Sequence, residues 1–197
     1  MAFLPLEPTF ARALLAASEL GCTLEVINII SVLSSSSKLF YDSTEEREAA
    51  LEARRKFRHP SGDHLTILNV VRSYDEIATS ESKVGRRAWC QKEFINSRCL
   101  VEAMDIRQQL REFCDKLKID WKLSCGDKEQ PVLRSLVSGL IQNTAFLQPD
   151  GSYKQVMGPS VGFPRKCEYN CGLLWHTGRQ DPSELSAMRQ EGSGHII

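Results

Sequence analysis

Apolar residues recur at intervals of three and four along most of the chain, which is the spacing of one face of an α-helix. The longest such run lies in residues 97–117, where the apolar positions are Leu100, Ala103, Ile106, Leu110, Phe113 and Leu117. A second segment, residues 23–33, is apolar on most faces and predicts a helix buried between others, with a strand as the alternative. The pattern therefore predicts a mainly α-helical bundle.

Shorter periodic segments predict four further helices around these two. They cover residues 9–18, residues 44–58, a stretch from Asp63 through Tyr74, and residues 131–147. Each has a residue typical of a helix start, namely Thr9, Ser43 with Glu46 as a capping box, Asp63 and Pro131. The polar stretch 78–87 contains Gly85 and predicts a surface loop instead.

The pattern changes near residue 148. Gln-Pro-Asp-Gly at 148–151 is a strong turn signal, and residues 153–157 alternate like a single strand. From Gly158 onward glycines and prolines replace any sustained apolar period, which predicts irregular structure. No run approaches the roughly 18 apolar residues of a membrane span. The first residues lack the basic and apolar regions of a signal peptide, so we expect a cytosolic or nuclear protein without a membrane partner.

Composition and charge narrow the function classes. The 197 residues include 42% hydrophobic and 25% charged residues, which is typical of a soluble globular domain. The 25 Lys and Arg residues balance the 25 Asp and Glu residues, so the net charge is zero and any nucleic-acid site must be a local patch. Bases outnumber acids between Lys83 and Lys122, where we expect local positive potential.

Metal-binding and disulfide patterns are weak. The seven cysteines are an odd number and are scattered through helical patterns, which indicates reduced thiols. Cys167 and Cys171, with His176 and the more distant His195, form the only cluster with the character of metal ligands. Their spacing fits no standard zinc pattern, so we expect no metal site.

Catalytic motifs are missing from the sequence. No Gly-x-x-x-x-Gly-Lys-Ser/Thr loop is present to bind nucleotide phosphates, and no acidic cluster at a strand end is predicted to hold magnesium. His64 next to Asp63 is better explained as part of a helix start than as an acid–base pair. Cys90 has no histidine near it in the sequence, which favours a packed thiol over a nucleophile.

Six sequence strings occur in order along the chain, at residues 3–15, 21–34, 62–70, 89–96, 106–110 and 148–153. They include Gly-Asp-His-Leu-Thr, Trp-Cys-x-x-x-Phe-Ile-Asn and Gln-Pro-Asp-Gly-Ser-Tyr. Each is weak alone, but their order and spacing together resemble the helicase-associated region of DEAH-box RNA helicases over residues 3–160. The Ser-Ser-Ser-Ser-Lys-Leu-Phe stretch resembles the nucleolar, ribosome-biogenesis members of that family, in fungal form.

The resemblance implies a division into four parts. Residues 1–20 would end a winged-helix domain, residues 21–125 would form the helical, ratchet-like domain, residues 126–160 would begin a truncated OB-fold, and residues 161–197 would be an irregular tail. In the family these modules lie against two RecA-like domains that bind and hydrolyse ATP with magnesium, and together they enclose single-stranded RNA. Because the RecA-like domains are missing here, we expect no cofactor in this chain and no ATPase activity from it alone.

The segment 162–197 departs from the family pattern. After Val-Met-Gly-Pro-Ser-Val the family would continue with an Ile-His-Pro-Ser-Ser-like string and further strands, whereas this chain reads Gly-Phe-Pro-Arg-Lys-Cys. A five-stranded barrel cannot close from one strand. Our hypothesis is that this segment comes from a retained intron, a shifted frame or a faulty gene model. A reading frame that runs through the codon for Val161 in genomic DNA without a splice junction would contradict it.

The long helix over 97–117 and its cap supply the candidate RNA-binding residues. Basic side chains off its apolar stripe would contact phosphates, and amide side chains would form hydrogen bonds. The candidates are Asn96, Arg98, Arg107, Gln108 and Arg111. The alternative is that Arg107 and Arg111 pair with Asp105, Asp115 or Glu112 on a solvated face.

Together these features predict an accessory, RNA-contacting region of an ATP-dependent DEAH-box RNA helicase that unwinds or remodels RNA. The resemblance implies rRNA processing in the nucleus, in the nucleolus for its ribosome-biogenesis members. The expected partners are single-stranded RNA and the RecA-like helicase core or helicase-activating proteins. The alternative is a non-enzymatic protein-interaction module that docks helicase partners, whose binding would survive nuclease treatment. An autonomous enzyme ranks third, and ATPase activity of the chain alone would support it.

Overall fold

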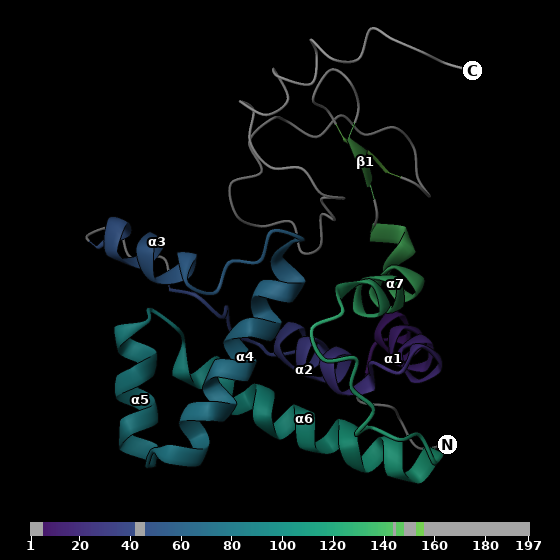
Figure 1. The fold of residues 1–197 in the computed structure, drawn as a ribbon, viewed down its shortest axis with the longest axis horizontal. Coiled ribbons are helices and arrows are strands. Elements are labelled where there is room, and N and C mark those ends of the chain that lie inside the picture. The colour runs from purple at the N-terminus through teal and green to yellow at the C-terminus, as the bar shows by residue number, and fades with distance from the viewer. Residues whose placement is uncertain (1–5, 42–45, 144, 148–152, 156–197) are drawn as a thin grey trace, which may run out of the picture.

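Seven helices and a short hairpin make up the part of the chain that the computed structural model describes, residues 6–41, 46–143, 145–147 and 153–155. The helices are α1 (Pro8–Leu20), α2 (Thr23–Leu33), α3 (Arg47–Arg55), α4 (Asp63–Ser80), α5 (Lys83–Lys92), α6 (Ser97–Leu117) and α7 (Glu129–Leu140) (Figure 1). A 3-10 turn (Ile141–Asn143) and strands β1 (Ala145–Leu147) and β2 (Tyr153–Gln155) follow. The mainly helical fold is confirmed. No helix in these ranges is long and apolar enough to cross a membrane.

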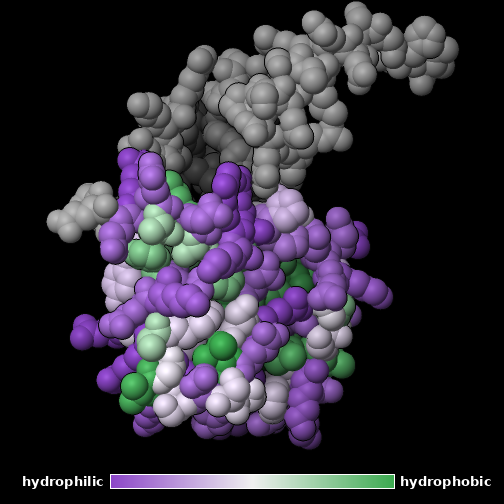
Figure 2. Space-filling view, turned by 60° about the vertical axis from the view of Figure 1, so that its left-hand side comes forward, coloured by the Kyte–Doolittle hydropathy of each residue, from purple (hydrophilic) through white to green (hydrophobic). Residues whose placement is uncertain are grey.

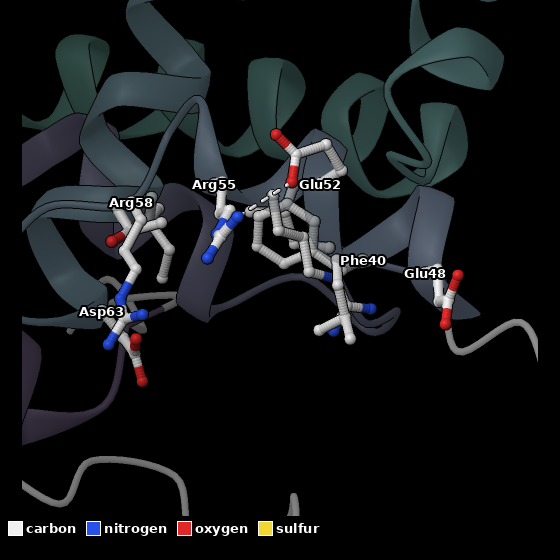
Figure 3. Close-up of a pocket in the computed structure, with 11 residues that line it drawn as sticks. Phe40, Glu48, Glu52, Arg55, Arg58 and Asp63 are labelled. Atoms are coloured by element: carbon white, nitrogen blue, oxygen red, sulfur yellow. Dashed lines mark hydrogen bonds and ion pairs between the residues drawn. The ribbon is translucent and has the colours of Figure 1, made fainter. Parts of the chain in front are cut away.

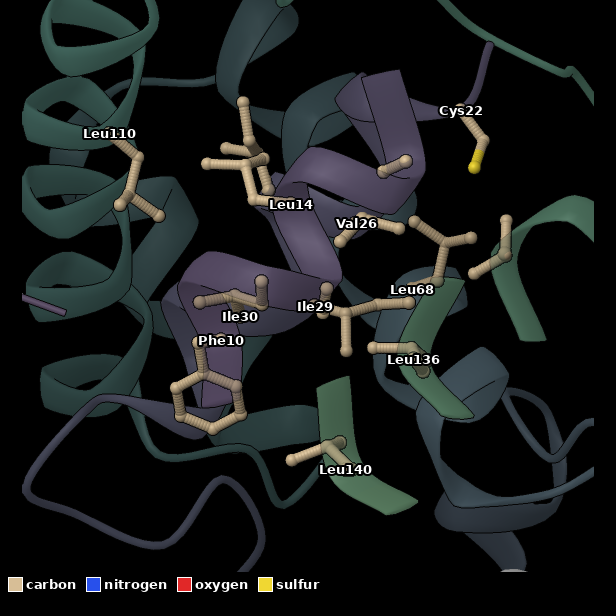
Figure 4. Packing of buried hydrophobic residues seen from close by; sticks show 14 of the residues in the cluster. Phe10, Leu14, Cys22, Val26, Ile29, Ile30, Leu68, Leu110, Leu136 and Leu140 are labelled. Carbon is tan, nitrogen blue, oxygen red and sulfur yellow. The ribbon is translucent and has the colours of Figure 1, made fainter. Parts of the chain in front are cut away.

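Helix α2 is the centre of the bundle. Nearly all of its side chains are buried, and it packs against α1, α4, α6 and α7. Figure 4 shows Val26, Ile29 and Ile30 of this helix among apolar side chains of its neighbours, including Leu14 and Leu136. A helix that is apolar all round is stable only when other helices cover it. The prediction of a buried helix over residues 23–33 is confirmed, and the strand alternative is wrong.

Helices α1 and α7 pack closely against each other. Helix α1 begins at Pro8, whose fixed φ suits the first helical position, so the predicted N-cap Thr9 lies inside the helix. Gly21 ends α1 in the left-handed conformation, with φ at 71°. At the interface, a Cβ atom on Gly139 of α7 would overlap the Thr9 carbonyl and lie 2.8 Å from the Cβ of Ala13. The absence of a side chain at Gly139 therefore sets the separation of the two helices.

Helix α5 was not predicted, because residues 78–87 were expected to form a loop. Helix α4 instead continues to Ser80, and the Ser82 hydroxyl caps α5 by accepting a hydrogen bond from the Gly85 amide at 3.4 Å. The Trp89 ring then lies with its centroid 6.1 Å from those of both Phe57 and Tyr74. Tertiary packing and a cap outweigh the glycine, so the loop prediction is wrong.

Helix α3 is shorter than expected and stands at the edge of the bundle (Figure 1). It covers Arg47–Arg55 rather than residues 44–58, and its N-cap is Glu46. The capping-box residue Ser43 lies outside the described residues. The helix ends early because Phe57 turns into the core, where its carbonyl accepts a hydrogen bond from Asn69 Nδ2 at 3.1 Å. Helix α4 likewise begins at Asp63 itself, after Gly62 as its N-cap.

The C-terminal part of the described chain also differs from the prediction. Helix α7 spans Glu129–Leu140 instead of 131–147, so Pro131 lies in its first turn rather than at its first position. Residues 145–147 form β1, which pairs antiparallel with β2, with Phe146 opposite Lys154. The strand expected at 153–157 is thus present as residues 153–155 and has a partner. The remainder of the expected OB-fold start, residues 156–160, and the tail lie outside the described ranges.

Candidate nucleic-acid interface

Asn96 is the N-cap of α6. Its Oδ1 accepts hydrogen bonds from the backbone amides of Arg98 and Cys99, at 3.1 and 3.4 Å. Its Nδ2 donates to the carbonyl of Lys38 at 3.1 Å, and its backbone amide donates to the Leu39 carbonyl at 2.8 Å. Asn96 therefore fixes the start of α6 against the segment before α3. An RNA contact by its amide stays a prediction, and the second N–H of Nδ2 is the donor that these bonds leave over.

Arg107 lies between three helices. Its guanidinium donates two hydrogen bonds to the carboxylate of Asp75 on α4, at 2.7 and 3.0 Å, and reaches Asn28 Oδ1 of α2 at 3.4 Å. The Arg107 side chain is only 14% exposed. Two parallel bonds to one carboxylate are the strongest geometry available to an arginine. Arg107 therefore forms an ion pair, but not the expected one: its partner is Asp75 of α4 and none of the acids of α6, and its side chain is largely buried instead of lying on a solvated face.

Arg111 stacks on an aromatic ring that follows α6. Its guanidinium carbon lies 4.7 Å from the ring centroid of Trp121, whose Nε1 donates to Asp115 Oδ1 at 2.9 Å. Lys122 Nζ lies 5.4 Å from the same centroid. Burial lowers the pKa of Arg111, the charge of Arg107 lowers it further, and Asp75 partly opposes both effects. A half-buried ring with two cations beside it is a suitable platform for stacking a base.

Trp121 was missed by the sequence analysis. It lies in the connection between α6 and α7, outside every helical period. Lys118 turns the chain back with a left-handed φ of 59°, and this turn brings Trp121 under Arg111. The only available signal was an aromatic residue next to Lys122 in a polar segment, a combination common in nucleic-acid sites.

Arg98 and Gln108 are exposed on α6. The Arg98 side chain forms no hydrogen bond or ion pair within the described ranges, whereas Gln108 Nε2 donates to Glu112 Oε1 at 3.1 Å. The helix as a whole is electrically balanced, because four bases stand against four acids. The bases are Arg98, Arg107, Arg111 and Lys116, and the acids are Glu102, Asp105, Glu112 and Asp115. Of the five candidates, the structure leaves Arg98 and Gln108 on the surface and Arg111 in a partly buried stack.

A pocket of about 770 Å³ lies between α3 and α4 (Figure 3). Apolar side chains contribute to its walls, among them Phe40, Leu51 and Ile67, and charged side chains of both signs form the rest. Arg54 stacks over the Phe40 ring with its guanidinium carbon 5.0 Å from the centroid. The charged lining residues are three arginines and three acids, so the pocket carries little net charge. They are Arg54, Arg55, Arg58, Glu48, Glu52 and Asp63.

The cysteines of the described part of the chain are buried, except Cys125, which is half-buried. Cys90 is buried, and desolvation raises the pKa of its thiol to about 11, as it does for Cys114 and Cys125. A thiol with such a pKa is a poor nucleophile at neutral pH. The five cysteines of the described part are free, as expected. That part holds no group of three potential metal ligands, while Cys167, Cys171, His176 and His195 lie outside it.

Acidification is expected to destabilise the fold through His64. Burial lowers the pKa of His64 from 6.5 to about 4, against a smaller opposing effect of Asp63. Between pH 4 and 6.5 His64 is therefore protonated in the unfolded chain and neutral in the folded chain. The stability that the neutral imidazole provides is complete above pH 6.5 and is lost as the pH falls toward 4, by up to about 1.4 kcal/mol per pH unit. Urea unfolding between pH 7 and 5 measures this slope.

The matched variant for that experiment is His64→Gln, which removes the titrating group. Its free energy of unfolding should depend less steeply on pH than that of the wild type, with a difference of about 2 kcal/mol accumulated by pH 5. Equal slopes for the two proteins would contradict the assignment to His64.

Comparison with known proteins identifies relatives of this helical chain among RNA helicases. Residues 7–67 match the family model "Helicase associated domain (HA2), ratchet-like". The chain is 39% identical over 153 residues to mouse "ATP-dependent RNA helicase DHX33", covering 78% of this chain and 21% of that protein. It is 35% identical over 169 residues to "Pre-mRNA-splicing factor ATP-dependent RNA helicase DEAH10" of Arabidopsis thaliana, covering 82% of this chain and 23% of the relative. Human "Probable ATP-dependent RNA helicase DHX35" is 34% identical over 152 residues, with 77% and 20% covered.

The chain thus spans about a fifth of the length of these curated relatives. The matched segment includes α1, α2, α3 and the start of α4. The division into four parts expected from the sequence stays a prediction. The ratchet-like match and the similarity to several helicases together show that this chain is homologous to the helicase-associated region of the DEAH-box RNA helicases.

Proposed function

We propose that this chain is the RNA-contacting accessory region of an ATP-dependent RNA helicase that unwinds or remodels RNA. The observation that supports it best is the partly buried stack of Arg111, on α6, with Trp121 in the connection that follows this helix. Single-stranded RNA is bound by aromatic rings that stack on bases and by cations that neutralise phosphates. Both features occur together at this point, within a region homologous to helicases.

Each exposed candidate has a separate role in this proposal. Trp121 would stack on an unpaired base, since base stacking is tolerant of sequence. Arg98 and Arg111 would contact phosphates, and Gln108 would exchange its bond with Glu112 for one to the RNA. Arg107 and Asn96 would support this surface from within the fold. ATP hydrolysis with magnesium would be performed by the RecA-like core, the proposed protein partner, because this chain has no motif for it.

The cellular role is the broadest part of the proposal. One relative named above, DEAH10, is called a pre-mRNA-splicing factor, and so is a putative helicase of Schizosaccharomyces pombe that is 32% identical over 161 residues. These names favour RNA processing in the nucleus. Processing of ribosomal RNA in the nucleolus is the narrower proposal, and it rests on the serine-rich stretch at 34–40. Imaging of the tagged protein separates a nucleolar from a nucleoplasmic location.

Replacing Trp121 by Ala is expected to weaken RNA binding about fivefold or more, because stacking of one base contributes ~1–3 kcal/mol. Fluorescence anisotropy with a labelled single-stranded oligouridylate measures the affinity. Trp121→Phe keeps an aromatic face and should retain most of it. Far-UV circular dichroism of both variants checks that the helical content is unchanged.

The proposal would be wrong if three proteins bound RNA with the same affinity. They are the wild type, the Trp121→Ala variant and the double variant Arg98→Ala with Arg111→Ala. Loss of affinity in Trp121→Phe as large as in Trp121→Ala would instead assign the effect to packing under Arg111. The two aromatic variants therefore separate a binding role from a structural one.

A second candidate function is a protein-interaction module that docks helicase partners. The pocket between α3 and α4 favours it, since Leu51 is 45% exposed at its wall and the surrounding charges are mixed. Mixed charge on an apolar floor suits a protein segment better than a polyanion. Leu51→Glu should then abolish partner binding that survives nuclease, while RNA affinity stays unchanged. Binding lost with the RNA alone would reject this candidate.

A further inference from the structure

Helix α5 concentrates positive charge without counter-charge. Four of its ten residues are basic and none is acidic, the basic ones being Lys83, Arg86, Arg87 and Lys92. Within the described chain none of these four side chains forms an ion pair or a hydrogen bond, and the Nε of Arg86 is buried without a partner. Helix α6, by contrast, balances four bases with four acids. The excess positive potential expected between residues 83 and 122 therefore resides mainly on α5.

One side of α5 is fully exposed. The exposed positions follow two rows of i, i+4 spacing, so they share a face of the helix, called here the α5 face. They are Lys83, Val84, Arg87, Ala88, Gln91 and Lys92. The opposite side holds Trp89 and the buried Cys90 against the bundle. Figure 2 shows the side of the molecule that α5 occupies, where hydrophilic side chains are interspersed with less polar ones.

Nearby acids do not neutralise this face. Glu93 is 8% exposed and binds Lys56 Nζ with both carboxylate oxygens, at 3.1 and 2.8 Å. The carboxylate of Glu81 lies against Gly85, which helix geometry places on the opposite side from Lys83 and Arg87. Lys83 also occupies the first helical position, where the peptide dipoles are positive and a cation is unfavourable. A bound anion would offset the repulsion among these cations and between Lys83 and the positive end of the helix dipole.

We propose that the α5 face binds backbone phosphates of single-stranded RNA, as a second contact separate from the Arg111–Trp121 stack. It rests on the proposed function for the identity of the polyanion. Lys83 and Lys92 lie nine residues apart, so the cations span about 13 Å of the helix, enough to follow several phosphates. The face carries no aromatic ring, and Val84 and Ala88 are small enough to let a strand approach closely. The contact is therefore independent of base sequence.

The decisive experiment measures RNA affinity of the full 197-residue chain as a function of salt. The variant replaces Lys83, Arg87 and Lys92 together by Gln, which keeps helix propensity and removes three charges. The matched control replaces Arg12, Lys128 and Arg134 by Gln, because these are exposed cations on α1 and at α7 with no partner in the described ranges. Net charge is then equal in the two variants.

The α5 variant is expected to lower the slope of log affinity against log salt by about 2, since each phosphate contact to a single strand contributes ~0.7. Its affinity at low salt should fall about tenfold, while the control keeps the slope of the wild type. A second readout is acylation of Lys83 and Lys92 by an N-hydroxysuccinimide ester, which RNA should slow relative to Lys128.

Several outcomes would overturn the proposal. RNA binding that depends on Trp121 but has the same salt slope in the α5 variant would reject the α5 contact and leave the proposed function standing. Equal acylation of Lys83, Lys92 and Lys128 in the presence of RNA would reject it as well. A chain that binds no RNA would reject both. If polyglutamate competes for the α5 face as well as RNA does, the ligand of this face would be an acidic peptide and the proposal of RNA would be wrong.

Discussion

Gly139→Ala is expected to destabilise the protein by about 3 kcal/mol, the reverse of its usual effect inside a helix. Alanine normally stabilises a helix interior by ~0.5–1 kcal/mol relative to glycine. Here the new Cβ would overlap the carbonyl oxygen of Thr9 and lie 2.8 Å from both the Cβ and the backbone nitrogen of Ala13. Because two of these atoms belong to the backbone of α1, relief requires the two helices to separate. Urea unfolding followed by circular dichroism measures the difference.

The control for this prediction is Ser138→Ala, one position earlier in α7. It makes a similar change in helix propensity at a partly exposed site, so its effect should stay within ~0.5 kcal/mol of the wild type. A stabilised Gly139→Ala protein would show that α1 and α7 can move apart freely. The close packing seen here would then not contribute to the stability of the bundle.

Asp75→Ala is expected to lower the free energy of unfolding by about 2 kcal/mol, because it leaves the Arg107 guanidinium without its carboxylate. The two hydrogen bonds that it removes measure 2.7 and 3.0 Å, and Arg107 is 14% exposed. A fully buried pair would give ~3–5 kcal/mol, but Asp75 is 41% exposed and water screens part of the interaction. A double-mutant cycle with Arg107→Ala gives the coupling energy of the pair.

The comparison variant for this pair is Arg98→Ala, which removes an exposed arginine of the same helix. Its stability should match the wild type within ~0.5 kcal/mol. RNA affinity should show the opposite pattern to stability. Arg98→Ala should weaken RNA binding, whereas Asp75→Ala, which removes the partner of Arg107, should leave the RNA affinity of the folded protein unchanged. A coupling energy near zero, or an RNA affinity that falls in Asp75→Ala as much as in Arg98→Ala, would show that Arg107 serves the ligand instead of the fold.

Helices with a periodic apolar stripe could be predicted from the sequence, and α5, which tertiary contacts hold in place, could not. Helices α2 and α6 were predicted over their observed ranges: α2 is buried on nearly all sides and is apolar almost throughout, whereas one buried face of α6 imposes a sustained apolar period. Helix α5 shows no such period, since Trp89 and Cys90 alone carry its packing. The end of α7 was predicted too far along because Phe146 and Leu147 continue an apolar pattern that β1 uses instead.

The residues of the candidate interface also fall into those that the sequence could predict and those that it could not. Exposure of Arg98 and Gln108 follows from the helical period of α6. The partner of Arg107 could not be predicted, because Asp75 lies 32 residues away, on another helix. Trp121 belongs to no periodic segment, and its position depends on one left-handed residue, Lys118. Such contacts between elements are set by the fold rather than by local sequence.

The ion pair of Arg107 adds a polar anchor near the middle of α6. This helix has 21 residues, about 30 Å in length, and Arg107 fixes a point near its middle to α2 and α4. Arg98 lies toward one end and the Arg111–Trp121 stack toward the other. Buried Leu100 and Leu110 hold α6 on either side of Arg107. A strand bound at both contacts would therefore meet them at a fixed spacing along one helix.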